Sequence, residues 1–238
     1  MEPLFQNRSE AGRDLAVKLA AYANRPDVLV LALPRGGVPV AAEVARALHA
    51  PLDVFVVRKL GVPGREELAM GALASGGVRV LNEETIRAYG IPHDAIEQTA
   101  AREQEEIARQ EGIFRGGRAA AKIQGRTIIL IDDGLATGST MRAAVAAIRR
   151  QAPARIVVGV PVGAPETCAE FQHEADEVIC ARTPRPFFGV GMWFEDFSQT
   201  TDQEVRNLLA GSAGSSTPST TSLEMPHAFV DRSRPPAS

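Results

Sequence analysis

Short apolar segments alternate with longer amphipathic ones from Val28 to Cys180. The short segments are rich in Val, Ile and Leu, which is typical of buried strands. The longer ones repeat Ala or larger apolar residues every three to four positions, which is typical of helices. This alternation predicts βαβ units, so we expect an α/β fold with a mainly parallel, twisted sheet flanked by helices. The expected strands are Val28–Leu33, Val54–Val57, Ile128–Ile131, Ile156–Val160 and Val178–Cys180.

Four segments predict helices around this sheet. The first, Glu10–Tyr22, follows Ser9, a residue type that commonly caps a helix N-terminus. The other three are Val38–Leu48, Thr140–Arg149 and Pro165–Phe171.

A helical insert at Glu83–Gly112 interrupts the alternation. Its many Glu, Gln and Arg residues predict two helices, broken near Gly90-Ile91-Pro92. The insert could form a lid, an oligomer contact or a solvated hairpin. The solvated hairpin is favoured, because a run of charge on a helix usually marks its face toward water.

Composition sets the limits of the domain. Hydrophobic residues make up 45% and charged residues 23% of the 238-residue chain, as in an ordinary globular protein. Apolar periodicity ends near Gly211, after which Gly, Ser, Thr and Pro dominate. We therefore expect one domain over residues 1–210 and a disordered tail over residues 211–238.

Several classes of protein and site are not expected. No apolar run approaches the roughly 20 residues of a spanning helix, and Met1–Arg8 carries no export signal, so a cytoplasmic protein without membrane contact is expected. The formal charge of −3 provides no basic excess for nucleic acid. Cys168 and Cys180 lack a CxxC pair and are interpreted as buried thiols, neither a disulfide nor a zinc site.

Two carboxylates follow one expected strand directly. Asp132 and Asp133 come after Ile128–Ile131, and open α/β sheets bind their ligands at the carboxyl ends of strands. Thr137–Thr140 then supplies hydroxyls and a glycine where a helix begins, and free amides there can hold a phosphate. The carboxylates would repel that anion unless they face sugar hydroxyls or Mg²⁺. A ribose with a 5-phosphate satisfies both halves.

This segment resembles the binding motif for 5-phosphoribosyl 1-pyrophosphate (PRPP) of type I phosphoribosyltransferases, and is closest to the adenine branch. The resemblance implies the type I fold with a small hood. It also implies that Asp132 and Asp133 hold the ribose 2- and 3-hydroxyls and Mg²⁺, the metal mostly through substrate and water. The residues that would wrap the 5-phosphate are Ala136, Thr137, Gly138, Ser139 and Thr140.

Two further strand ends carry cations. In the turn Leu33–Pro39, Arg35 and Gly36 are expected to contact pyrophosphate, where the resembled family often has a cis peptide that does not precede proline. Arg58 and Lys59 resemble the Arg-Lys pair of the adenine branch, which helps to neutralise pyrophosphate. The alternatives are a plain turn with a surface Arg and ordinary surface charge.

The catalytic and base-binding residues depend more heavily on the resemblance. The hypoxanthine-guanine branch has an Asp where this chain has Ala136, whereas the adenine branch uses a Glu from a flexible loop. Glu66 or Glu67, in the loop Gly64–Gly77, is therefore the candidate general acid/base.

An aromatic segment is the candidate hood, at residues 183–200. It resembles the base-stacking segment of the hypoxanthine-guanine branch, so Trp193 and Asp196 are candidates for binding the base. Core packing explains these aromatic residues equally well.

The expected function is transfer of the phosphoribosyl group from PRPP to a nitrogen base or another amine, with Mg²⁺ as cofactor and a homodimer as an open option. A PRPP sensor without transfer activity is the alternative, although the sequence shows neither a basic face nor a DNA-binding module. A hydrolase with Asp132 as nucleophile would leave the Thr137–Thr140 turn unexplained.

Overall fold

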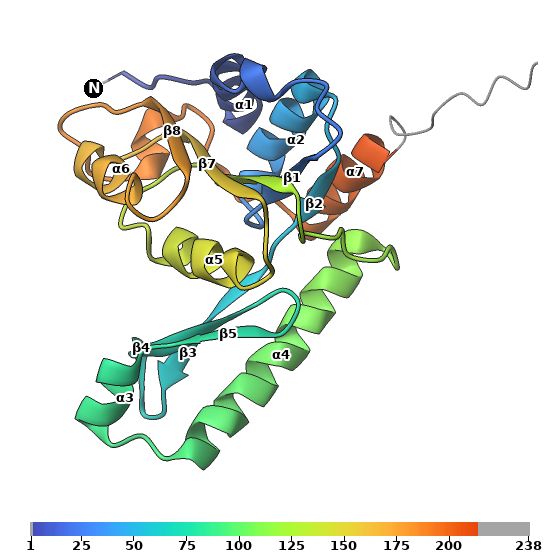
Figure 1. The fold of residues 1–238 in the computed structure, drawn as a ribbon. Coiled ribbons are helices and arrows are strands. Elements are labelled where there is room, and N and C mark those ends of the chain that lie inside the picture. Colours follow the sequence, from blue (N-terminus) through green and yellow to red (C-terminus); the bar gives the residue numbers. More distant parts are fainter. Residues whose placement is uncertain (1, 214–238) are drawn as a thin grey trace, which may run out of the picture.

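A five-stranded parallel sheet organises the body of the protein. The computed structural model describes residues 2–213 (Figure 1). The strand order is β2-β1-β6-β7-β8, and all four neighbouring pairs are parallel. The α/β fold class predicted from the alternation is confirmed. The strands are β1 (Val28–Ala32), β2 (Leu52–Val54), β6 (Thr127–Ile131), β7 (Arg155–Val162) and β8 (Glu177–Arg182).

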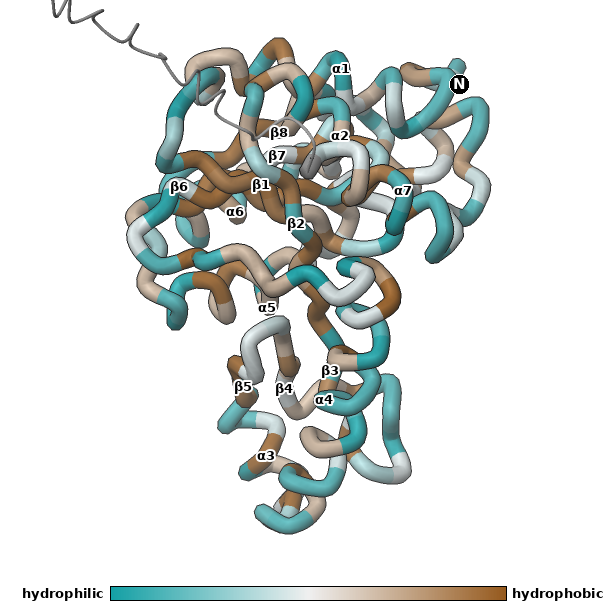
Figure 2. The backbone as a smooth tube through the Cα atoms, turned by 90° about the vertical axis from the view of Figure 1, so that its right-hand side faces the viewer, coloured by the Kyte–Doolittle hydropathy of each residue, from teal (hydrophilic) through white to brown (hydrophobic). Residues whose placement is uncertain are grey.

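Helices cover both faces of this sheet. Along β1, Val28, Val30 and Ala32 pack into one apolar core, and the alternate residues Leu29 and Leu31 pack into another, as the two-residue period of a strand requires. The strands are accordingly among the most hydrophobic parts of the chain (Figure 2). The first core also contains residues of α1 (Arg8–Lys18), α2 (Gly37–Leu48) and α7 (Asp202–Ala213), and the second contains residues of α5 (Ser139–Arg149) and α6 (Pro165–Phe171).

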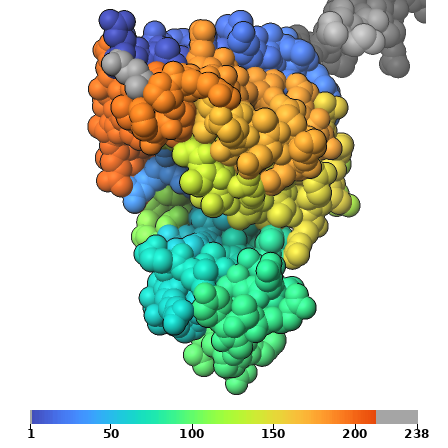
Figure 3. Space-filling model, turned by 90° about the vertical axis from the view of Figure 1, so that its left-hand side faces the viewer, coloured from blue at the N-terminus to red at the C-terminus, as the bar shows by residue number. Residues whose placement is uncertain are grey.

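The chain between β2 and β6 forms an arm that projects from the body (Figures 1 and 3). It contains an antiparallel sheet in the order β3-β4-β5. The loop expected at 64–77 is wrong, because most of it forms β4, and the strand expected at 54–57 is split between β2 and β3. The arm consists of β3 (Val57–Val62), β4 (Arg65–Ala74), β5 (Val78–Leu81), α3 (Glu83–Tyr89) and α4 (His93–Arg115).

The two helices of the insert and the break between them are confirmed, but the solvated hairpin is wrong. Ile96, Ala100, Ile107 and Phe114 are buried along α4 and join the apolar core. Their spacing of four and seven residues places them on one face of the helix. The other charged residues of α4 are at least partly exposed, whereas Glu103 and Arg115 are buried.

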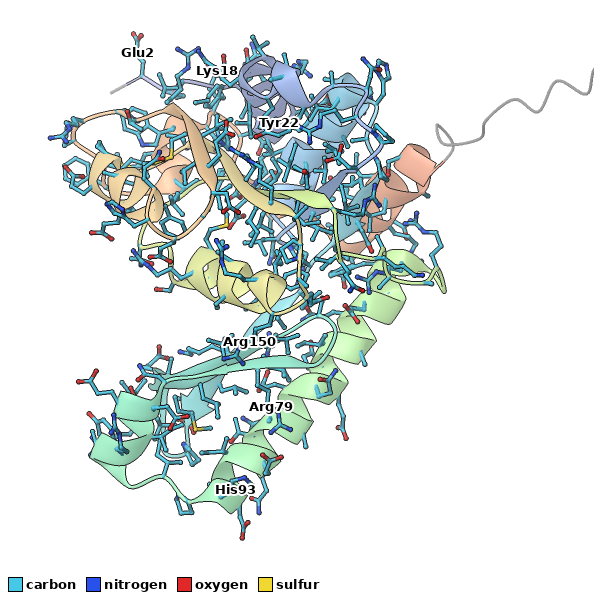
Figure 4. The ribbon with its side chains drawn as sticks, viewed as in Figure 1. Glu2, Lys18, Tyr22, Arg79, His93 and Arg150 are labelled. Carbon is cyan, nitrogen blue, oxygen red and sulfur yellow. A yellow bond between two sulfur atoms is a disulfide. The ribbon has the colours of Figure 1, made fainter. Side chains whose placement is uncertain are left out.

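Polar contacts tie the arm to the body at several places, and two arginines, Arg115 and Arg150, take part in them. Buried Arg115, at the end of α4, donates from Nε to Asp53 Oδ1 at 2.8 Å and from Nη2 to the Val54 carbonyl at 2.9 Å. On the other side, Arg150, which follows α5, donates to the carbonyl of Arg79 on β5 (Figure 4). These contacts join the arm to β2 and to the end of α5.

Three local expectations are corrected. Asn7, not Ser9, caps α1, because its side chain accepts from Glu10 N. Cys168 and Cys180 form a disulfide between α6 and β8, because these neighbouring elements bring their Cα atoms to 6.5 Å. The domain continues past residue 210, since α7 ends at Ala213, and the rest of the expected tail lies outside the described residues. No helix in residues 2–213 is long and apolar enough to cross a membrane.

Candidate functional site

The acid pair, Asp132 and Asp133, and the glycine turn, Leu33–Pro39, meet at the carboxyl edge of the parallel sheet. β1 and β6 are neighbours with Ala32 opposite Ile131, so the loops that follow them lie side by side. A Cβ on Gly36 would collide with Asp133 Oδ2, and one on Gly37 would lie 2.8 Å from the Ile131 carbonyl oxygen. Only glycine allows this approach. The Pro34-Arg35 peptide bond in this turn is cis, as the resemblance implied.

Each carboxylate of the pair is held by one of its two oxygens. Asp132 Oδ1 accepts from Asp133 N at 2.8 Å, and Asp133 Oδ2 accepts from Arg8 Nε at 2.8 Å. Over residues 2–213 no hydrogen bond engages Asp132 Oδ2 or Asp133 Oδ1. One acceptor oxygen on each acid is therefore available to a ligand.

Burial and mutual repulsion act on these acids. Burial raises the pKa of Asp132 well above its ordinary value, the charge of Asp133 raises it further, and the Asp133 amide and Arg8 act in the opposite direction. Burial also raises the pKa of Asp133, against the hydrogen bond and charge of Arg8. Arg8 therefore favours the ionised form of both acids, the form that can only accept hydrogen bonds.

Side chains of α5 and α6 hold residues 136–140, which we call the phosphate loop. Thr167 Oγ1 donates to the Ala136 carbonyl at 2.7 Å, and Arg142 Nη1 donates to the Thr137 carbonyl at 2.9 Å. Gly138 has φ +75°, and a Cβ there would collide with the Phe171 ring. Glycine is thus required for both the conformation and the packing of this loop.

The first turn of α5 offers free amides beside exposed hydroxyls. The first hydrogen bond of the helix runs from Arg142 N to Gly138 O at 2.8 Å, so the amides of residues 139–141 have no partner within the helix. Thr137, Ser139 and Thr140 are exposed. The turn begins six positions after Asp133 and has the donors that a phosphate group needs.

Arg35 and Gly36 occupy different positions relative to the acids. Gly36 lies against Asp133, whereas Arg35 is exposed and pairs with Asp202 of α7, with 3.2 Å between Nε and Oδ1. Arg35 therefore lies in the glycine turn after β1, but its guanidinium group contacts a surface carboxylate, that of Asp202.

The structure separates Arg58 from Lys59, because neighbouring residues of a strand point to opposite faces. Arg58 Nε pairs with Glu103 of α4 at 2.9 Å. Lys59 instead lines a cleft of about 440 Å³ between α5 and the arm, together with Ser139 and Thr140. Of the two cations, only Lys59 shares a cleft with the phosphate loop.

Glu66 and Glu67 are the second and third residues of β4 in the arm and are exposed. Glu67 Oε2 is 3.7 Å from Lys59 Nζ, and the Glu67 carbonyl accepts from the same ammonium group at 3.3 Å. Neither Glu lines the 440 Å³ cleft. The assignment of a general acid/base to this pair remains a prediction.

The candidate hood is built jointly with the N-terminus. Phe5 forms a parallel bridge with Phe194, and Trp193 is buried against the Phe187 ring at 6.4 Å between centroids. Trp193 is therefore in an apolar core, as the packing alternative held. Asp196 is exposed, and its Oδ1 accepts from Ser198 N at 2.9 Å.

The hood also touches the acidic loop, because a Cβ on Gly134 would collide with the Val190 side chain.

Sequence reasoning missed Arg8, which lies 125 positions before its partner Asp133. No motif or spacing marked it, since a lone Arg near the start of a chain is indistinguishable from surface charge.

Comparison with known proteins gives the family of this chain. Residues 4–193 match the family model of the phosphoribosyl transferase domain. Over 206 residues, 87% of the chain, the sequence is 46% identical to proteins of two Mycobacterium tuberculosis strains, CDC 1551 / Oshkosh and H37Rv, each named "Putative phosphoribosyl transferase". The chain covers 46% of those proteins, so it spans about half the length of the curated relatives it matches.

A solved structure shows the same fold. The crystal structure of TT1426 from Thermus thermophilus is 39% identical in sequence, covers 87% of this chain and 98% of its own, and has a TM-score of 0.76. The family model matches well over half of the chain and includes both the acid pair and the phosphate loop. The chain belongs to the phosphoribosyl transferase family.

Proposed function

We propose that this protein transfers the 5-phosphoribosyl group from PRPP to a nitrogen base and releases pyrophosphate. The observation that carries the proposal is the meeting of three loops at one sheet edge: the acid pair, the phosphate loop and the glycine turn, with Gly36 against Asp133. PRPP carries a sugar diol, a 5-phosphate and a pyrophosphate. The diol matches the acid pair, the 5-phosphate matches the phosphate loop and the pyrophosphate matches the glycine turn.

Different residues would bind different parts of PRPP. The free oxygens of Asp132 and Asp133 would accept from the ribose hydroxyls, and the first turn of α5 would hold the 5-phosphate through its amides and the hydroxyls of Ser139 and Thr140. The amide-rich turn at Gly36 and the Arg35 side chain would bind pyrophosphate.

The transfer breaks the bond between C1 of the ribose and the pyrophosphate oxygen and forms a bond between C1 and the acceptor nitrogen. Negative charge accumulates on the leaving pyrophosphate, so nearby cations would stabilise the transition state. Lys59 lines the cleft beside the phosphate loop and could reach an anion there, whereas Arg58 would first have to leave Glu103. We therefore assign more of this role to Lys59.

The acid pair fits a Mg²⁺ ion that would be bound jointly by protein and substrate oxygens. Asp132 and Asp133 supply the carboxylate oxygens that Mg²⁺ prefers, but residues 2–213 contain no group of three His, Cys, Asp or Glu side chains arranged to hold a metal ion. The two acids would thus hold it together with substrate oxygens and water. When bound, the ion would neutralise charge on the pyrophosphate.

The acceptor nitrogen must lose a proton in most such transfers, and Glu66 and Glu67 are our candidates to assist it. Both are exposed on the arm, and Glu67 lies 3.7 Å from Lys59. A pH–rate profile of Glu66→Gln and Glu67→Gln variants tests this role. Loss of one limb of the profile in either variant supports it, and unchanged profiles in both contradict it.

Calorimetry with PRPP and Mg²⁺ tests the shared binding claim. Wild-type protein should bind, and the Asp132→Asn plus Asp133→Asn double variant should bind at least tenfold more weakly, because both sugar-facing carboxylates lose their charge. Equal heats in the two proteins would contradict the proposal.

A panel of purine and pyrimidine bases, with pyrophosphate release as the readout, then separates an enzyme from a sensor. Release that depends on one base supports transfer. Tight PRPP binding without release from any base would favour the sensor.

A further inference from the structure

Arg8 joins three segments of the site through one guanidinium group. Nε donates to Asp133 Oδ2 at 2.8 Å, and Nη1 donates to the Ser198 carbonyl at 2.7 Å. The guanidinium carbon lies 3.9 Å from the centroid of the Phe197 ring, and the side chain is 12% exposed. An arginine with two hydrogen-bonded nitrogens and a stacked face has little freedom to turn.

The backbone of Arg8 is fixed as well. Asn7 caps α1, so Arg8 is the first residue of that helix, and Phe5 just before it is paired with Phe194 of the hood. Further along, α1 packs closely on α2, since a Cβ on Gly12 would lie 2.7 Å from the Val40 carbonyl oxygen. The position of Arg8 relative to the sheet edge is thus set on both sides.

Arg8 pairs with Asp133 although other acids are close by. Asp196 lies two positions before Ser198, but its Oδ1 accepts from Ser198 N. Glu204 accepts from Thr201 N at 2.7 Å and Thr201 Oγ1 at 2.9 Å. Both surface acids therefore have local donors, which leaves the single ion pair of Arg8 to the sugar-facing carboxylate.

This pairing has two consequences for a ligand. It engages Asp133 Oδ2 and so fixes the orientation of the carboxylate, with Oδ1 as the oxygen that has no hydrogen bond within the described residues. Its positive charge also offsets the repulsion between the two adjacent acids, which favours the ionised form that accepts hydrogen bonds from a diol. Both effects act on the half of the site that would hold the diol and leave the amides of α5 unchanged.

We propose that Arg8 is a positioning residue that fixes Asp133 for the ribose diol, so that affinity for the sugar, and not for a simple phosphate, depends on Arg8. The inference rests on the proposed function. It assigns a role to a residue outside the acid motif, the glycine turn and the phosphate loop. It further implies that the N-terminal segment completes the sugar site.

Calorimetric titrations with ribose 5-phosphate and, separately, inorganic phosphate test the inference. Arg8→Met should weaken ribose 5-phosphate binding about tenfold or more, because a hydrogen bond to a charged group is lost, and should leave phosphate binding within about twofold of wild type. Arg8→Lys should restore part of the sugar affinity, since an ammonium can pair with Asp133 but cannot form both hydrogen bonds and the stack.

Arg13→Met is the matched control, because Arg13 lies on the same helix and is 62% exposed, with Glu43 at 3.7 Å. It should bind both ligands as wild type does. If Arg8→Met fails to fold, the comparison of Arg8→Lys with wild type decides instead: a selective loss for ribose 5-phosphate supports the role.

Two results would overturn the role of Arg8 alone: wild-type affinity for ribose 5-phosphate in both Arg8 variants, or an equal loss for sugar phosphate and inorganic phosphate. The proposed function survives either result, provided that wild type binds ribose 5-phosphate and the Asp132→Asn plus Asp133→Asn variant does not. Failure of wild type to bind ribose 5-phosphate would overturn both proposals together.

Discussion

Replacing Gly36 with alanine isolates the contact between the glycine turn and the acid pair. Gly36 has φ −57° and ψ −37°, so alanine fits the backbone without strain. The added Cβ would collide with Asp133 Oδ2 and lie 2.8 Å from Asp133 Cγ. The effect of the substitution therefore comes from the displaced carboxylate.

The size of the effect follows from these distances. Carbon atoms in contact are usually about 3.5–4.0 Å apart, so the carboxylate must move by roughly 1 Å. That shift disrupts the 2.8 Å hydrogen bond to Arg8. A hydrogen bond to a charged group contributes about 1.5–3 kcal/mol, and about 1.4 kcal/mol corresponds to a tenfold change in affinity. PRPP should thus bind about 10- to 100-fold more weakly.

Calorimetry with PRPP and Mg²⁺ measures this change, and thermal unfolding checks that the variant is folded. Gly112→Ala is the matched control, because a Cβ on Gly112 meets nothing within 4 Å and the residue lies on α4 in the arm. It should bind PRPP as wild type does. Binding by Gly36→Ala within about twofold of wild type would refute the argument that this glycine sets the acid pair.

Three further predictions concern stability. Cys168→Ser should lower the free energy of unfolding by about 2–4 kcal/mol under oxidising conditions, because it removes the disulfide to Cys180, and reduced wild type should match the variant in urea titrations. Arg115→Met should cost about 3–5 kcal/mol by leaving Asp53 buried without its cation, and a loss under 1 kcal/mol in the same assay contradicts this. Hydrogen bonds to Arg25 and Thr127 lower the pKa of Asp27 to about 2. Wild type should therefore be more stable than Asp27→Asn above pH 4 and should lose that advantage as the pH falls to 2. A stability difference that is the same at pH 2 and pH 6 would contradict this prediction.

The parallel sheet and the acid motif could be predicted because each depends on local sequence. A buried central strand such as Ile128–Ile131 is apolar throughout, and the acids and hydroxyls that follow it belong to one turn. Neighbouring strands of a parallel sheet then bring the glycine turn to the same edge. Placing two loops together required only the order of the strands.

The arm was harder to predict because its strands lack a clear pattern. β4 begins with exposed Arg65, Glu66 and Glu67 and continues through a mixture of small and larger apolar residues, so neither alternation nor a long apolar run marks it. Once β3 is known to be a strand, the opposite directions of Arg58 and Lys59 follow from its two-residue period.

The Arg8 contact could not be predicted from this sequence. Its partner is 125 positions away, and the pairing depends on how α1 packs on α2 and how Phe5 pairs with the hood. The disulfide was missed for a related reason, because only the packing of α6 beside β8 brings its two cysteines together. Such contacts are products of the tertiary structure.

The central claim is that one sugar phosphate spans the acid pair and the phosphate loop. A crystal structure of the complex with ribose 5-phosphate tests it most directly. We predict phosphate oxygens within about 2.7–3.2 Å of amides in the first turn of α5, with the 2- and 3-hydroxyls donating to Asp132 and Asp133. A ligand bound in the cleft beside Lys59, with its hydroxyls away from both acids, would contradict the account.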